Sequence, residues 1–228
     1  ITNARIHGYK IAILADSVSN LTIQYCDLSY NYRQELKSNL DREDISDWMS
    51  YHKNDQNEWM RYGAGIYLRK CNNAKIIGNT VTNGQCGLMM TSCDSATVTD
   101  NNFSFNSGIG IGLYKSSYNN INHNRLDFNV RGYSYKKYRR GQDSAAILVF
   151  EQCNHNIFAF NSAPLKSRAT IVPLASKMNV AGIACTPYIL AIGSSQNFKF
   201  ETCGQVKPSF VIASFHLSPS LSKETPMI

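Results

Sequence analysis

The sequence has few charged residues, no long apolar run and, before residue 164, no proline. Charged side chains make up 17% of the 228 residues and hydrophobic ones 43%, a balance that excludes wholesale disorder. The longest apolar stretch, residues 180–193, is interrupted by Pro187 and is shorter than the roughly 18 residues that a membrane span needs. We therefore expect a folded protein with a sizeable core and no membrane span.

Cysteine is too sparse to build a disulfide framework. The seven cysteines, at positions 26, 71, 86, 93, 153, 185 and 203, are odd in number and show no CxxC spacing. This pattern predicts buried free thiols rather than a metal site. The net charge of +7 suggests an acidic partner, although the total charge alone does not identify one.

The composition changes abruptly at residue 163. All six prolines follow this point, whereas 21 of the 23 asparagines and 14 of the 16 acidic residues precede it. We therefore treat 1–163 as one domain and 164–228 as a separate tail. Two interpretations of the tail remain open: a cap over the end of the domain, or a segment that is not its natural continuation, for example after a shift of reading frame near Ala163.

A repeat of about 22 residues organises the first 163 residues. Short alternating apolar runs separated by Asn, Gly, Asp and Ser predict short strands with tight turns, and no copy holds a helical period. Five copies are recognisable, and each fits one coil of a parallel β-solenoid, with equivalent residues stacked about 4.8 Å apart. Four apolar columns recur in three consecutive copies: Ile66, Leu88 and Ile111; Leu68, Met90 and Leu113; Ile76, Val98 and Ile121; Val81, Phe103 and Leu126.

Polar columns recur with the same period. Asn79, Asn101 and Asn124 fall at one turn position, where stacked amides would form an asparagine ladder from coil to coil, and Cys26 occupies this column in the first copy. Cys71 and Cys93 share another column. Their spacing of 22 residues reflects the coil, so we expect a stack of small side chains rather than a metal site.

The recurring pattern I-x-L-x-x-C-x-x-A-x-I-x-x-N-x-V resembles the right-handed parallel β-helix repeat of pectate-lyase-like proteins and of carbohydrate-binding and sugar-hydrolase β-helices. The resemblance covers roughly residues 4–163. It implies an all-β, right-handed, single-stranded parallel β-helix and an extracellular or periplasmic location, although the chain shows no signal-peptide pattern. The segments 48–68 and 103–152 resemble more narrowly a bacterial group within this class, for which the resemblance implies no particular activity.

Two insertions, 32–62 and 130–144, interrupt the coils. Both enter at the turn before the strands that carry Ile66 and Ile147, so we expect them to project from one edge, three coils or about 14 Å apart. Residues 36–49 of the first insertion predict a short helix, with Trp48 and Met49 packed against the domain. Between the insertions, the residues that alternate with core positions would form an open outward strip. These residues are Tyr67, Arg69, Met89, Thr91, Gly112, Tyr114, Leu148 and Phe150.

The second insertion alternates cations with tyrosines and predicts binding of an acidic polysaccharide. Aromatic rings stack on sugar faces, and arginines hold uronate carboxylates in bidentate hydrogen bonds. We expect Tyr67 and Tyr114 to share one outward column as a stacking platform. Two alternatives stay open: ion pairing with the acidic first insertion, and single-stranded nucleic acid, which nothing else in the chain supports and which we do not expect. The predicted substrate-binding residues are Tyr67, Arg69, Tyr114, Arg131, Tyr138, Arg139 and Arg140.

Two reaction types compete if the protein is an enzyme. Hydrolysis needs a pair of carboxyl groups, available from Asp55, Glu58, Asp143 and Glu151. β-Elimination from a uronate needs a base and a cation, for which His52, Tyr114, Arg69, Arg139 and Arg140 are candidates. No carboxylates converge on the strip, so we expect neither a metal nor a cofactor. The rival from another class is a non-catalytic scaffold whose loops contact proteins, and we expect a monomer.

Overall fold

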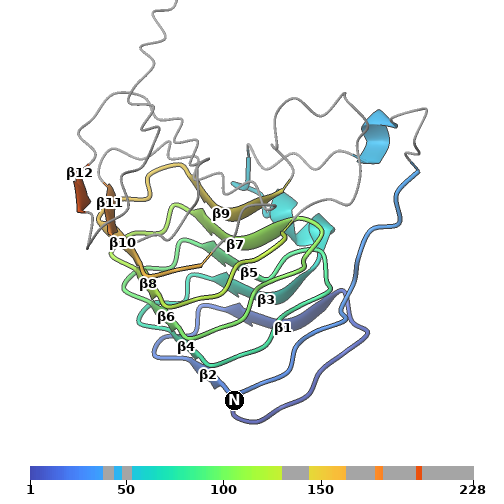
Figure 1. Ribbon diagram of the computed structural model, residues 1–228, viewed down its shortest axis with the longest axis horizontal. Coiled ribbons are helices and arrows are strands. Elements are labelled where there is room, and N and C mark those ends of the chain that lie inside the picture. Colours follow the sequence, from blue (N-terminus) through green and yellow to red (C-terminus); the bar gives the residue numbers. More distant parts are fainter. Residues whose placement is uncertain (38–43, 48–52, 130–143, 163–177, 182–198, 202–228) are drawn as a thin grey trace, which may run out of the picture.

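A computed structural model describes residues 1–37, 44–47, 53–129, 144–162, 178–181 and 199–201 (Figure 1). Its strands form two parallel sheets. The long-strand sheet has the order β1-β3-β5-β7-β9, and the short-strand sheet has the order β12-β11-β10-β8-β6-β4-β2. Long strands are β1 (Ile11–Asp16), β3 (Ala64–Arg69), β5 (Leu88–Thr91), β7 (Ile109–Tyr114) and β9 (Ala145–Phe150). Short strands are β2 (Thr22–Gln24), β4 (Lys75–Ile77), β6 (Thr97–Thr99), β8 (Asn120–Asn122), β10 (Asn156–Ala159), β11 (Met178–Ala181) and β12 (Lys199–Glu201).

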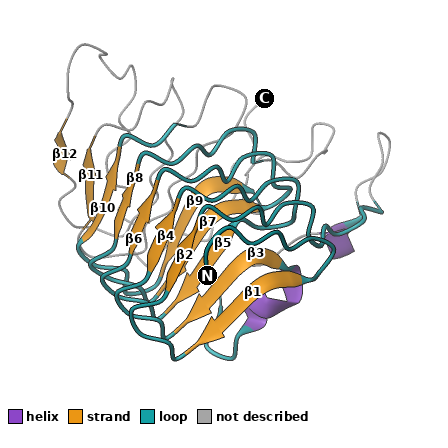
Figure 2. Cartoon of the chain, turned by 90° about the horizontal axis from the view of Figure 1, so that it is seen from below, coloured by secondary structure: helices purple, strands orange, loops and turns teal. Residues whose placement is uncertain are grey.

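Successive coils stack in the register that the repeat predicts. Ile66 pairs with Leu88, Leu88 with Ile111, and Ile111 with Ile147 along the long-strand sheet. The interior of the coils is one continuous apolar core, in which these side chains are at most 2% exposed. Figure 2 shows the two sheets as two sides of each coil, with loops closing the remainder. The parallel β-helix and its apolar columns are therefore confirmed.

The asparagine ladder is confirmed as well and continues for one rung more than predicted. Asn101 Oδ1 accepts from the backbone N–H of Asn79 at 2.9 Å, and Asn124 Oδ1 accepts from that of Asn101 at 3.1 Å. Asn161 Oδ1 extends the series by accepting from Asn124 N–H at 2.9 Å. At the other end Asn79 accepts from Cys26 N–H, which places Cys26 in the predicted column. The ladder satisfies backbone groups that turn inward and have no water to bind.

The cysteine column also matches the repeat. Cys93 Sγ accepts from the backbone N–H of Cys71 at 3.3 Å, Ser116 Oγ from that of Cys93, and Cys153 Sγ from that of Ser116. All four side chains are fully buried. Burial raises the pKa of the Cys93 and Cys153 thiols to about 12, so both stay protonated near neutral pH.

One column of small residues lets neighbouring coils approach closely. A Cβ atom on Gly87 would lie 2.5 Å from the carbonyl oxygen of Gly110, and one on Gly110 would lie 2.6 Å from that of Ala146. Contacts this short are essentially never made by real Cβ atoms, and backbone cannot move aside as a flexible side chain can. Glycine at these two positions is therefore a condition of the stacking.

Both insertions join the long-strand sheet, since 32–62 precedes β3 and 130–144 precedes β9. In the first, the structure has two short 3-10 helices, η1 (Ile45–Asp47) and η2 (Glu58–Tyr62). Within the predicted helix over 36–49 the structure describes only 36–37 and 44–47, of which Ile45–Asp47 form a 3-10 turn, so the helix stays a prediction; Trp48 and Met49 lie outside the described residues. Residues 130–143 of the second insertion also lie outside them.

In the tail, β11 pairs with β10 and β12 pairs with β11, both in parallel. The short-strand sheet therefore continues beyond residue 163. The interpretations of 164–228 as a cap or as a non-natural continuation stay predictions.

Candidate functional site

The outward strip between the insertions is a second packed cluster, not an open surface. Tyr67 is 0% exposed and Leu148 3%, because Trp59 and Tyr62 of η2 pack over them. The ring of Trp59 meets that of Tyr114 edge to face, with centroids 5.5 Å apart. The prediction of an open groove over these residues is therefore wrong. We call this the outer cluster, and its buried members are Trp59, Tyr62, Ala64, Tyr67, Cys86, Met89, Ile109, Tyr114, Ala145, Leu148 and Phe150.

The stacking platform of Tyr67 and Tyr114 is also wrong, for two reasons. The two residues belong to different columns: Tyr67 pairs with Met89, whereas Tyr114 pairs with Thr91. In addition, Tyr114 is only 2% exposed, so neither ring offers a face to a sugar. Alternation along a strand gave the side of the sheet correctly, but it did not show that η2 covers that side.

Asn54 fastens the first insertion to the long-strand sheet. Its Nδ2 donates to Thr91 Oγ1 at 2.7 Å and to the Tyr67 hydroxyl at 3.2 Å, while its Oδ1 accepts from the backbone N–H of Trp59 at 2.9 Å. Asn54 is 1% exposed, so these bonds form away from water, where leaving a polar group unpaired is costly. The amide therefore fixes both the start of η2 and the chain beside it.

Charged groups gather where the long strands end, just beyond the outer cluster. Arg69 ends β3 and forms an ion pair with Asp16, which ends β1. The hydrogen bond from Arg69 is the main cause that holds the pKa of Asp16 below its ordinary value. The Arg69 side chain remains 31% exposed, so it can also reach a ligand. We call this margin the charged rim, defined by Asp16, Asp55, Arg69, Lys115 and Glu151.

A second ion pair lies two coils further along the rim. Lys115 Nζ lies 2.5 Å from Asp55 Oδ1, and it is 5.4 Å from the centre of the Tyr114 ring. The hydrogen bond from Lys115 lowers the pKa of Asp55 and, reciprocally, that of Lys115 is raised. Burial raises the pKa of the Tyr114 hydroxyl. At neutral pH Asp55 is therefore a carboxylate, Lys115 an ammonium and Tyr114 a protonated phenol.

The structure brings together only some of the residues predicted from the sequence. Arg69, Asp55 and Glu151 lie on the rim, where the charge of Glu151 contributes to the raised pKa of Lys115. Glu58 instead accepts from the backbone N–H of Gln56 at 3.0 Å, a local contact before η2. Six of the predicted residues lie outside the described part of the chain: His52, Arg131, Tyr138, Arg139, Arg140 and Asp143.

Sequence reasoning missed Asp16, Asn54 and Lys115. A signal existed for Asp16, because aligning Ile13 and Ala15 with Ile66 and Leu68 also aligns Asp16 with Arg69. Asn54 meets Tyr67 and Thr91, and Lys115 meets Asp55, only because the first insertion folds over the sheet. Among the described residues, no three His, Cys, Asp or Glu side chains are arranged to hold a metal ion. No helix within those ranges has the length and apolar character to cross a membrane.

The family model for the right-handed β-helix region matches residues 1–163, and the chain belongs to this family. The match spans the five long strands and the short strands β2 to β10. No curated protein and no solved structure matches the chain.

Proposed function

We propose that this member of the right-handed β-helix family binds an acidic polysaccharide along the charged rim. The observation that carries the proposal is the pair of cations, Arg69 and Lys115, held on one sheet margin two coils apart, each beside an exposed carboxylate. Two coil spacings are about 10 Å, which suits two sugar units. A cell-surface or matrix polymer of this kind would meet the protein outside the cytoplasm.

The existing ion pairs favour exchange with a ligand. Exposed ion pairs contribute roughly 0 to 1 kcal/mol, because water solvates the separated charges well. A uronate carboxylate can therefore replace Asp16 or Asp55 at little cost. Arg69 can hold it in a bidentate pair, and Lys115 can hold the next carboxylate as a point charge.

The pKa directions support binding more than cleavage by these groups. A hydrolase needs a carboxyl group that stays protonated, and the pKa of Asp55 is lowered instead. Elimination needs a base near neutral pH, whereas the pKa values of Lys115 and Tyr114 are both raised. Cleavage by His52 or Asp143 remains a prediction from the sequence.

The second insertion, residues 130–144, is a basic loop that we treat as a separate contributor to polysaccharide binding. It is attached at Ala145, the first residue of β9, whereas the charged rim lies where the long strands end. Five residue steps at about 3.3 Å each separate these two ends of the sheet. The rim and the loop are therefore to be tested by separate substitutions.

The test measures binding of polygalacturonate by calorimetry at low salt, and the release of unsaturated uronate by ultraviolet absorbance. Charge-assisted hydrogen bonds contribute about 1.5 to 3 kcal/mol, so Arg69→Gln and Lys115→Gln should each weaken binding roughly tenfold or more. Arg125→Gln is the matched control, because Arg125 is an exposed arginine paired with Asp127 away from the rim. Arg139→Ala and Arg140→Ala test the loop.

Three outcomes decide the proposal. Loss of affinity in the rim variants but not in Arg125→Gln supports it, and a fall of affinity as the salt concentration rises supports its electrostatic basis. Unchanged affinity in both rim variants overturns it. No binding of any glycan across an array favours the rival proposal, a scaffold whose loops contact proteins.

A further inference from the structure

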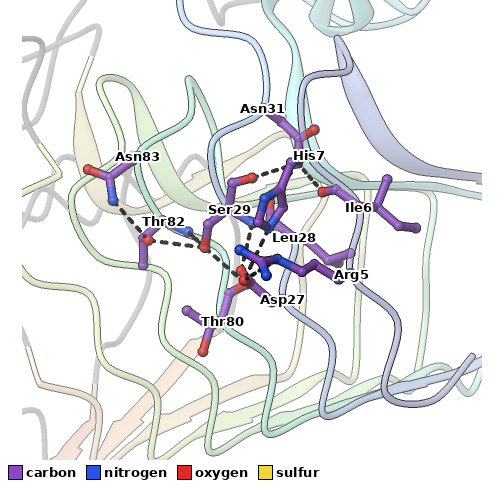
Figure 3. Close-up of polar contacts among 10 residues, drawn as sticks. All are labelled: Arg5, Ile6, His7, Asp27, Leu28, Ser29, Asn31, Thr80, Thr82 and Asn83. Carbon is purple, nitrogen blue, oxygen red and sulfur yellow. Dashed lines mark hydrogen bonds and ion pairs between the residues drawn. The ribbon is translucent and has the colours of Figure 1, made fainter.

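A second polar cluster lies on the loop side of the first coils, outside the charged rim (Figure 3). Arg5 and Asp27 are bridge partners in neighbouring coils, and Asp27 is in turn bridged to Thr80. His7 follows two residues after Arg5 and points to the same side. Figure 3 shows both the guanidinium and the imidazole directed at the carboxylate of Asp27.

The contacts within this cluster are incomplete. Arg5 Nε lies 3.7 Å from Asp27 Oδ2, and the Arg5 side chain is 78% exposed, so most of its N–H groups face solvent. His7 Nε2 lies 3.1 Å from the same oxygen. Its direction does not meet hydrogen-bond geometry, however, and within the described residues this buried nitrogen has no hydrogen-bond partner.

The carboxylate of Asp27 is held in a fixed orientation. Its Oδ1 accepts from the backbone N–H of Ser29 at 3.2 Å, and Ser29 Oγ accepts from the backbone N–H of Thr82 at 3.1 Å. Burial raises the pKa of Asp27, but the hydrogen bonds from Ser29 and the electrostatic contribution of His7 outweigh it and lower the pKa overall. Asp27 is therefore an ionised acceptor whose Oδ2 faces Arg5 and His7.

An exposed aromatic ring adjoins the cluster. Tyr30 is 64% exposed, and its ring lies edge to face with the His7 ring, with centroids 5.9 Å apart. Its backbone N–H donates to Thr82 O at 2.9 Å, which anchors the turn that carries it. A rigid ring beside fixed donors and acceptors can stack on the apolar face of a sugar with little loss of entropy.

We propose that Arg5, His7, Asp27 and Tyr30 form a second binding site, which takes the adjacent hydroxyl groups of a neutral hexose. One hydroxyl donates to Asp27 Oδ2, which His7 holds from 3.1 Å away, the next accepts from Arg5, and the sugar ring stacks on Tyr30. The charges of Arg5 and Asp27 cancel, so this site has no net attraction for an anion. It therefore differs in ligand class from the charged rim and goes beyond the function proposed for that margin.

The test is isothermal titration calorimetry of the full chain with cellohexaose, maltohexaose and mannohexaose. At least one of the three should bind the wild type. Arg5→Ala, Asp27→Asn and Tyr30→Ala should each weaken that binding about tenfold, whereas Arg69→Gln should leave it unchanged. Tyr25→Ala is the matched control, because Tyr25 lies on the same coil and is 61% exposed, but packs beside Gly78.

Three results overturn the proposal: no binding of any of the three hexasaccharides, unchanged affinity in Arg5→Ala and Tyr30→Ala, or an equal loss in Tyr25→Ala. Arg5→Ala protects the test against misfolding, since that side chain is mostly exposed and its removal leaves the core intact. Failure here is independent of failure at the rim, because the rim is measured with polygalacturonate and its own variants.

Discussion

Replacing Asn101 by alanine removes the centre of the asparagine ladder. Asn101 is 2% exposed, and its amide makes bonds on both sides. Its Oδ1 accepts from the backbone N–H and the Nδ2 of Asn79, both at 2.9 Å. Its Nδ2 donates to Ile76 O at 2.8 Å and to Asn124 Oδ1 at 2.9 Å.

The expected loss of stability follows from the polar groups that Asn101→Ala leaves unpaired. Asn79 Nδ2 keeps its bond to Ile23 O, and Asn124 Oδ1 keeps the backbone N–H of residue 101. The backbone N–H of Asn79 loses its acceptor, and one unpaired buried donor costs about 1 to 3 kcal/mol. With the small cavity added, we expect Asn101→Ala to lower the free energy of unfolding by about 3 kcal/mol. This corresponds to a fall in Tm of roughly 6 to 12 °C.

The assay is thermal and urea unfolding followed by circular dichroism. Asn102→Ala is the matched control, because this neighbouring amide is only half-buried and accepts one bond, from Ser104 N–H at 3.2 Å. We expect it to cost about 1 kcal/mol or less. If Asn101→Ala costs no more stability than Asn102→Ala, the buried bonds of the ladder do not stabilise the protein.

Three further predictions concern the outer cluster, the close stacking and the thiols. Trp59→Ala should lower the free energy of unfolding by about 3 to 5 kcal/mol and speed hydrogen exchange in the long-strand sheet; unchanged exchange would show that η2 does not cover it. Gly87→Ala should lower Tm sharply, because its Cβ would meet a backbone oxygen, whereas Gly84→Ala, with its nearest atom 3.5 Å away, should change Tm little; equal effects would contradict the steric argument. Cys93 and Cys153 should resist a thiolate-specific reagent in the native protein at pH 8 and react once it is unfolded, since their native pKa values are about 12; rapid native labelling, measured by mass spectrometry, would refute their burial.

Much of the fold can be predicted from the sequence because each coil of a solenoid repeats the same pattern of strands and turns. Each coil places the same residue type at the same height, so the columns of Ile66 and Leu68 and the ladder of Asn79 and Asn101 recur as a period of about 22 residues. The helix predicted for 36–49 had no such repetition to support it, and the part of it that the structure describes holds the 3-10 turn Ile45–Asp47.

The parallel coils, their register and the buried amides could be predicted from the sequence, because they depend on contacts between equivalent residues at a fixed spacing. Which outward residues meet solvent depends instead on how distant segments pack, and this could not be predicted. Alternation placed Tyr67 outside the coil, but η2 folds back over it, so a side chain outside one core lies inside another. Both candidate sites also depend on tertiary contacts. Lys115 meets Asp55, 60 residues away in the chain, because the first insertion folds over the sheet. Asp27 meets His7 because the turns that carry them lie in neighbouring coils.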